Sequence, residues 1–103
     1  MGTTLEICSI EYDLSFRSHG HKITFTQIGN SIYDDDLIEP LMEISRQNYW
    51  YLESECGFTG ELLGKDIIAI FKKYKGEESK NTKFILENLK GKEEEFFRIS
   101  LSF

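Results

Sequence analysis

The sequence predicts a single α+β domain over residues 1–103, with an antiparallel sheet of three to four strands covered on one face by about three helices. Its length of 103 residues is close to the usual size of one domain. Apolar and polar residues alternate near both ends of the chain, as they do in half-buried strands. Helical periodicity fills the middle, and helices grouped between strands favour an antiparallel sheet with one covered face.

Two strands joined by a short loop are expected at the N-terminal end. Leu5 and Ile7 have one parity, and the apolar residues from position 8 onward have the other, which suggests a bulge or twist near Ile7. The second strand is expected over about 22–26, after a loop that contains Gly20. We expect the later apolar set of the first strand to face the core: Cys8, Ile10, Tyr12, Leu14 and Phe16.

Three helices are expected in the middle of the chain. The first is predicted to open with Asp34, Asp35 and Asp36, and Asp36 and Glu39 have the spacing of a capping box. The second covers about 64–75, and the third follows Ser79 as its cap. Residues 48–53 fit either the end of the first helix or a strand, whereas the glycines of 57–64 indicate turns. A last strand is expected over 97–103.

The net charge of −6 is concentrated in the N-terminal part of the chain. Residues 1–62 hold 11 acids and 3 bases, which gives this part a net charge of −8. Such a surface repels phosphate, so we expect no direct binding of nucleic acid. Its field would instead attract a basic protein partner.

The sequence also favours a cytoplasmic protein that does not enter the membrane. No stretch approaches the roughly 20 apolar residues of a membrane helix, and the N-terminus lacks the pattern of a signal peptide. Cys8 and Cys56 are expected to be reduced, since a domain of this size needs no disulfide.

The motifs that come nearest to catalytic or cofactor chemistry are incomplete. Gly60 and Gly64 are separated by three residues where a phosphate-binding loop needs four, and Asp66 stands where that loop needs Ser or Thr. His19 and His21 have the spacing of two metal ligands, but nothing fixes a third ligand near them. We therefore expect no catalytic residues, no metal and no cofactor.

A partner-binding surface is the candidate site that the sequence favours. Tyr and Trp are residue types that anchor interfaces, and acids of the N-terminal part would surround them. In the alternative interpretation, these rings complete a small core and the acids cap helices or face solvent. The candidate residues are Asp34, Asp35, Asp36, Tyr49, Trp50, Tyr51, Glu53 and Glu55.

These features lead to the hypothesis of a small non-enzymatic inhibitor of the immunity-protein or antitoxin type. It would neutralise a basic toxin, such as a nuclease, by charge complementarity. A phage-encoded inhibitor of a host defence nuclease would use the same physics. The competing class is a small enzyme or ligand-binding domain, which a deep pocket with converging polar groups would favour.

Overall fold

The computed structural model describes residues 3–13 and 22–103, which form one antiparallel sheet of five strands and three helices. The predicted α+β class is confirmed, with one strand more than expected. The elements in chain order are β1 (Thr4–Asp13), β2 (Lys22–Gln27), α1 (Asp35–Asn48), β3 (Tyr51–Glu53), β4 (Gly57–Leu63), α2 (Gly64–Lys73), α3 (Ser79–Asn88) and β5 (Phe96–Ser102).

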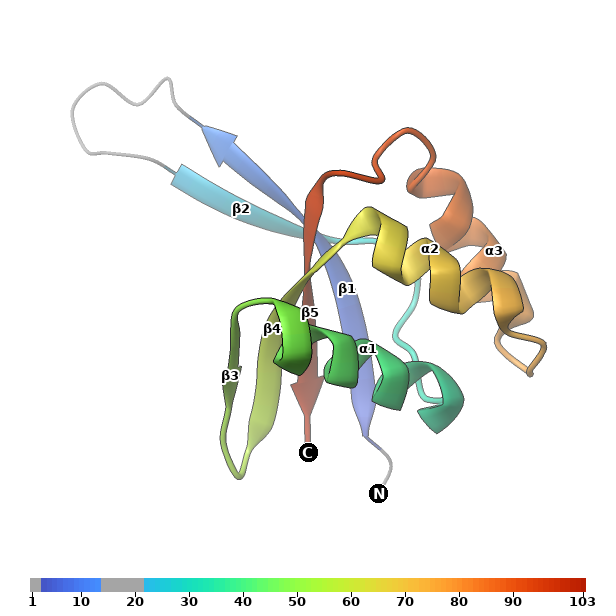
Figure 1. Cartoon of the computed structure of the whole chain (residues 1–103), viewed down its shortest axis with the longest axis horizontal. Helices are drawn as coiled ribbons and strands as arrows, with labels where there is room; N and C mark the ends of the chain where they lie inside the picture. The colour runs from blue at the N-terminus through green and yellow to red at the C-terminus, as the bar shows by residue number, and fades with distance from the viewer. Residues whose placement is uncertain (1–2, 14–21) are drawn as a thin grey trace.

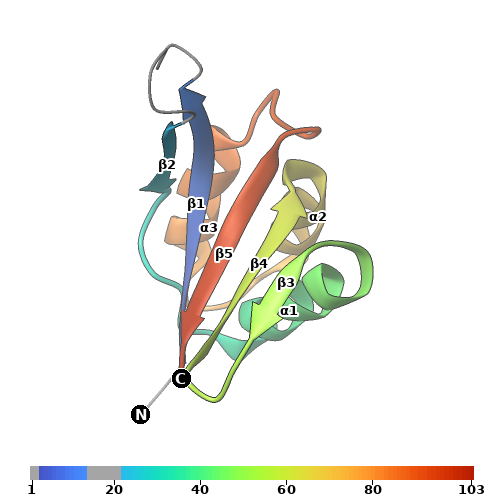
Figure 2. The same cartoon turned by 90° about the vertical axis from the view of Figure 1, so that its left-hand side faces the viewer.

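The strands lie in the order β2-β1-β5-β4-β3. The strand β5 is the last of the five in the chain and the middle one in the sheet, where it pairs with both β1 and β4. All three helices lie on one side of the sheet, so that in Figure 2 the five strands are in front and the helices behind. The other side of the sheet is open, as far as the described residues show.

The core lies between the sheet and the helices. Each of the three central strands contributes alternate residues to it, and β4 shows the alternation of half-buried and buried positions most clearly. The helices contribute their apolar stripes, as amphipathic helices do. The fully or almost fully buried side chains include Leu5, Ile7, Phe58, Leu62, Phe97, Ile99, Leu37, Leu41, Ile67, Phe71, Ile85 and Leu89.

The predicted orientation of β1 is wrong. Leu5 and Ile7 are the buried residues, whereas Cys8 and Ile10 are half-buried on the open face and Tyr12 is 62% exposed there. No bulge is needed, because β1 pairs in continuous register with β5 over 4–9 and with β2 over 8–13. Both parities of this strand are apolar, and the inward one is selected by pairing beside the buried Ile99 and Leu101 of β5.

The glycine-rich segment forms β4 instead of the expected turns. Gly60 occupies a covered position of β4, where a side chain would collide with the Oγ atom of Ser45 on α1 and lie 2.9 Å from the Phe58 ring. Glycine is therefore used here for the close approach of a helix to the sheet. The open question over residues 48–53 is answered by a helix that ends at Asn48 and a short strand, β3.

The β1–β2 hairpin continues beyond the rest of the sheet. Residues 10–13 of β1 pair with β2 alone, and Figure 1 shows this arm projecting away from the helices. Residues 14–21 lie outside the described residues, and with them Leu14, Phe16 and the two histidines, His19 and His21.

Two helix caps differ from prediction. The first helix opens within the three aspartates, as predicted, but its N-cap is Asp34 and not Asp36. The third has Glu78 as its N-cap, with Ser79 inside the helix. Within the described part of the chain, no helix has the length and apolar character that crossing a membrane requires.

Candidate functional site

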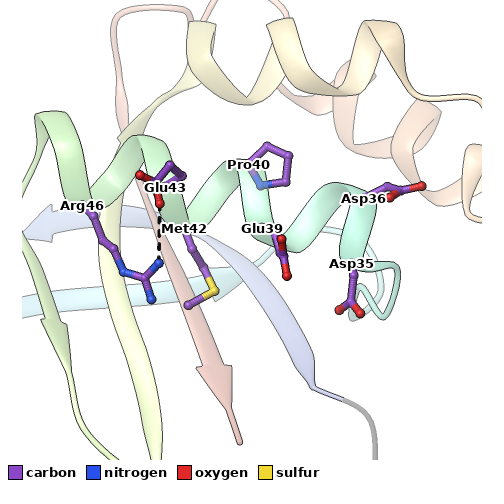
Figure 3. A pocket seen from close by; sticks show the side chains of 7 residues that line it. All are labelled: Asp35, Asp36, Glu39, Pro40, Met42, Glu43 and Arg46. Carbon is purple, nitrogen blue, oxygen red and sulfur yellow. Dashed lines mark ion pairs between the residues drawn. The ribbon is translucent and has the colours of Figure 1, made fainter.

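A row of exposed carboxylates follows the solvent side of α1. Asp35, Asp36, Glu39 and Glu43, called here the acidic row, are all exposed, and they border an open depression that Pro40, Met42 and Arg46 also line. Figure 3 shows the four carboxylates spread along the helix instead of converging on one point. This arrangement presents negative charge along about 12 Å of helix.

Asp34 belongs to the framework of the fold rather than to this row. Its carboxylate accepts hydrogen bonds from the backbone N–H of Asp36, at 3.0 Å, and from the hydroxyl of Tyr74. These bonds, that from Tyr74 foremost, lower the pKa of Asp34, because both favour the charged form. The backbone N–H of Asp34 donates in turn to the Glu78 carboxylate at 2.7 Å, so that this region connects α1 to α3.

Tyr49 is also structural. Its hydroxyl donates to Asp66 at 2.6 Å, and its ring packs edge-on against Phe96 with 5.9 Å between the ring centroids. The bond to Asp66, followed by burial, raises the pKa of Tyr49 to about 12. Asp66 also accepts a bond from the backbone N–H of Leu63 at 3.2 Å, which secures the start of α2. These contacts favour the alternative interpretation, in which the Tyr49 ring completes the packing.

Trp50 and Tyr51 are both partly exposed, but on opposite faces of the sheet. The Tyr51 ring is 42% exposed and stacks on Phe58 on the helix side, with centroids 5.7 Å apart. Trp50 is 50% exposed and lies on the open side, with the Arg98 guanidinium 5.3 Å from its ring centroid. Adjacent residues of an extended chain point to opposite faces, so a run of three aromatic residues cannot form one patch.

Glu53 and Glu55 lie at the far end of α1 from the aspartates. Glu53 accepts two hydrogen bonds from the guanidinium of Arg46, both of 2.9 Å, which connect β3 to α1. Glu55 is exposed in the turn between β3 and β4. The helix between the two groups of predicted acids has 14 residues and is therefore about 21 Å long. The predicted site residues thus form two groups joined by the acidic row, whose members Glu39 and Glu43 were not among the predicted site residues.

A second surface, not predicted as a site, covers the open side of the sheet. The open-face cluster consists of Ile10, Tyr12, Ile23, Phe25, Trp50 and Leu52, with Arg98 among them. The guanidinium of Arg98 lies 4.3 Å from the Phe25 centroid, as well as close to Trp50, and 3.8 Å from a carboxylate oxygen of Glu61. The signal in the sequence was that β1 is apolar in both parities, which indicates a strand with two apolar faces.

Neither cysteine is placed for catalysis or for disulfide formation. Both are free thiols; Cys8 is half-buried on the open face and Cys56 is exposed in the turn before β4. Burial, with a smaller effect of Glu6, raises the pKa of Cys8 and so disfavours its reactive thiolate. Within residues 3–13 and 22–103, no three side chains of His, Cys, Asp or Glu come together as metal ligands would.

Comparisons with known proteins add no relative to this picture. The two surfaces described above, the acidic row and the open-face cluster, are the features of the molecule that bear on function. No protein-family model, no curated protein and no solved structure matches the chain.

Proposed function

We propose that this chain is a small non-enzymatic binding protein of the cytoplasm that neutralises a basic toxin, such as a nuclease, in the manner of an immunity protein or antitoxin. The observation that supports this most is the acidic row. Its four carboxylates are exposed on one helix. Arg46 forms an ion pair with one of them, Glu43, at 3.7 Å, but its guanidinium also donates two hydrogen bonds to Glu53.

Such a row of carboxylates can bind a cationic protein surface by electrostatic attraction. A nuclease holds the phosphates of its substrate with cationic side chains, and a helix that carries a line of carboxylates presents the same sign of charge to them. Complementary charge speeds association and disfavours wrong partners, although much of its effect is screened by salt. A rigid helix is also a suitable carrier, because the carboxylates need no ordering on binding.

The structure also suggests which aromatic side chain would anchor this contact. Tyr51 is on the helix side of the sheet and is half-exposed at the end of α1. Arg46 lies between the acidic row and this ring, with its guanidinium 5.3 Å from the Phe58 centroid. The proposed binding surface therefore consists of the acidic row, Tyr51, Glu53 and Glu55, whereas Trp50 and Tyr49 are outside it.

Capture of the partner with two matched variants tests the proposal. One variant replaces the acidic row (Asp35→Asn, Asp36→Asn, Glu39→Gln, Glu43→Gln). The control removes four exposed carboxylates elsewhere (Glu77→Gln, Glu87→Gln, Glu93→Gln, Glu94→Gln). We expect the parent and the control to retain the same basic protein from host extract at low salt, and the row variant to lose it. The purified partner should then be toxic or nucleolytic alone and inactive with the parent.

An acidic partner would contradict the proposal, and so would equal retention by the row variant at low salt. A phage-encoded inhibitor of a host defence nuclease would make the same contact, and the identity of the captured protein distinguishes it from an antitoxin.

A further inference from the structure

We propose that the open face of the sheet is the interface of a homodimer, in which two copies pack face to face about a twofold axis. This inference is independent of the toxin-binding role, since it concerns the side of the sheet that the helices do not cover (Figure 2). Dimerisation would leave both acidic rows free on the outside.

The first support is the apolar character of this face. Large apolar side chains are 43–66% exposed at the two edges of this face: Tyr12, Ile23 and Phe25 on β1 and β2, and Trp50 and Leu52 at β3. Between them the central strands present Arg98, Ser100, Thr59 and Glu61, and the Arg98 guanidinium contacts both Phe25 and Trp50. Large exposed apolar residues gathered on one face, unlike scattered ones, indicate a contact surface. The arm of β1 and β2 strengthens the argument, because a two-stranded ribbon is only marginally stable unless its apolar side is covered.

The second support is the size of the face. Five strands about 4.8 Å apart, with a mean length of about seven residues at about 3.4 Å per residue, give a face of about 600 Å². Two such faces bury about 1,200 Å² when they pack together, which reaches the lower end of specific stable interfaces. Aligned sheets pack about 10 Å apart with interdigitating side chains, which suits a mixture of rings and aliphatic groups.

The third support is charge. Of the strand side chains that the structure describes, only Glu6, Glu61 and Arg98 bring formal charges to the open face, a net of −1 against −6 for the whole chain. A basic partner would be drawn to the acidic row and not to this face. A second copy, in contrast, meets an almost neutral surface that already pairs Arg98 with Glu61 at 3.8 Å.

The net charge of the chain does not prevent this association. Each acidic row is separated from the open face by the sheet and a helix layer, so the two rows of a dimer would be about 30 Å apart if each layer adds about 10 Å. This separation exceeds the Debye length of about 8 Å at physiological ionic strength.

The test measures mass and Trp50 exposure over a range of concentrations of the full chain. Sedimentation should give twice the 12.0 kDa of one chain at high concentration. Trp50 is the only tryptophan and is half-exposed on the face, so its emission should shift to the blue and its quenching by acrylamide should fall as the dimer forms. The dimer mass and the changes in Trp50 emission and quenching should persist at high salt, because the contact is mainly apolar.

Three variants at exposed positions locate the interface. Phe25→Glu and Leu52→Glu lie on opposite edge strands, about 19 Å apart, and each should halve the mass while leaving circular dichroism unchanged. Phe84→Glu, on α3 and 56% exposed, should remain a dimer. The row variant of the preceding section should also remain a dimer, which separates this inference from the proposed function.

Two results would overturn the inference. One is a parent that stays at the mass of a single chain, with constant Trp50 quenching, up to its highest soluble concentration. The other is a dimer that Phe25→Glu disrupts and Leu52→Glu does not, because association would then follow the β2 edge instead of the whole face.

Discussion

Single side chains in this molecule connect segments that are far apart in the sequence. Glu78 accepts bonds from the backbone N–H groups of Tyr33 and Asp34, and the Tyr74 hydroxyl donates to Asp34 while accepting from the N–H of Glu78. The bonds of Glu78 to Tyr33 and Asp34, and of Tyr74 to Asp34, span 40 or more residues, so they fix where α1 starts relative to α3. Three of the predicted contact residues, Asp34, Tyr49 and Glu53, form side-chain bonds that connect different elements of the fold.

Asp34→Asn should reduce the acid sensitivity of folding. The pKa of Asp34 is lowered in the folded protein, so its contribution is present above the unfolded value of about 3.9 and is lost as the pH falls through the folded value. We expect the variant to be less stable than the parent at neutral pH and nearer to it in acid. Thermal unfolding across pH measures this, with the exposed Asp35→Asn as the control. A constant difference at all pH values would contradict the assignment.

Tyr49→Phe should destabilise the protein by about 1 kcal/mol at neutral pH, since it removes the bond to Asp66. Because the folded pKa of about 12 lies above the value of about 10 in the unfolded chain, the parent loses stability as the pH rises beyond about 10. The variant should lack this alkaline loss. Urea unfolding at neutral and alkaline pH tests both statements, with Tyr51→Phe, which keeps its stacked ring, for comparison.

The two thiols should differ in reactivity. Cys56 is exposed, whereas burial raises the pKa of Cys8 and lowers its thiolate fraction at neutral pH. We expect a thiol reagent to modify Cys56 first in the native protein and both residues after denaturation without reductant. Mass spectrometry of the parent, Cys8→Ser and Cys56→Ser assigns each step. If the denatured parent had no free thiol, the two cysteines would be disulfide-bonded and the cytoplasmic location doubtful.

At the scale of elements, α1 has two different sides. Its inner stripe, which includes Leu37 and Leu41, is buried, and Ser45 is fully buried where the helix approaches β4. Its outer side carries the acidic row. The same helix therefore contributes to the core and carries the proposed binding surface. Its packing in the core keeps that surface rigid.

Gly60→Ala should test how closely α1 approaches the sheet. The new methyl group would collide with the Oγ atom of Ser45, so we expect a loss of about 2 kcal/mol in the free energy of unfolding. Adding Ser45→Ala should recover part of this loss, because it removes the colliding oxygen. Denaturant unfolding of both single variants and the double variant gives the coupling. Thr59→Ala, the neighbouring position on the other face, is the control, and an equal loss there would exclude close approach as the cause.

At the scale of the whole molecule, the features that were predicted correctly are those that depend on residues close together in the sequence. The α+β class, the first two strands as a hairpin, the three helices and β5 were all predicted, because periodicity and capping residues depend on nearby sequence. The strand β4 was missed, since its glycines are required by a helix that arrives from elsewhere in the chain. The prediction of which face of β1 points to the core was wrong for the same reason. Both faces of this strand are apolar, and only its pairing with β5 decides which of them is buried.

The candidate site was less predictable than the fold. Composition indicated that acidic and aromatic residues form the candidate site. The direction in which Trp50 and Tyr51 point, however, depends on where α1 ends and β3 begins. The open-face cluster gathers residues from β1, β2, β3 and β5, and no spacing within the sequence brings these together. A surface built from several segments depends on the order of the strands in the sheet, and patterns within a single sequence do not reveal that order.

The central place of β5 has a consequence for the order of folding. The pairs β1–β2 and β3–β4 join neighbouring segments and can form as soon as each is synthesised, but no contact between strands joins the two pairs until β5 emerges from the ribosome. A nascent chain that ends before Phe96 would carry two half-sheets, with β1 and β4 as unpaired edges. The two half-sheets therefore join only when β5 is available, and until then their unpaired edges are open to chaperones and proteases.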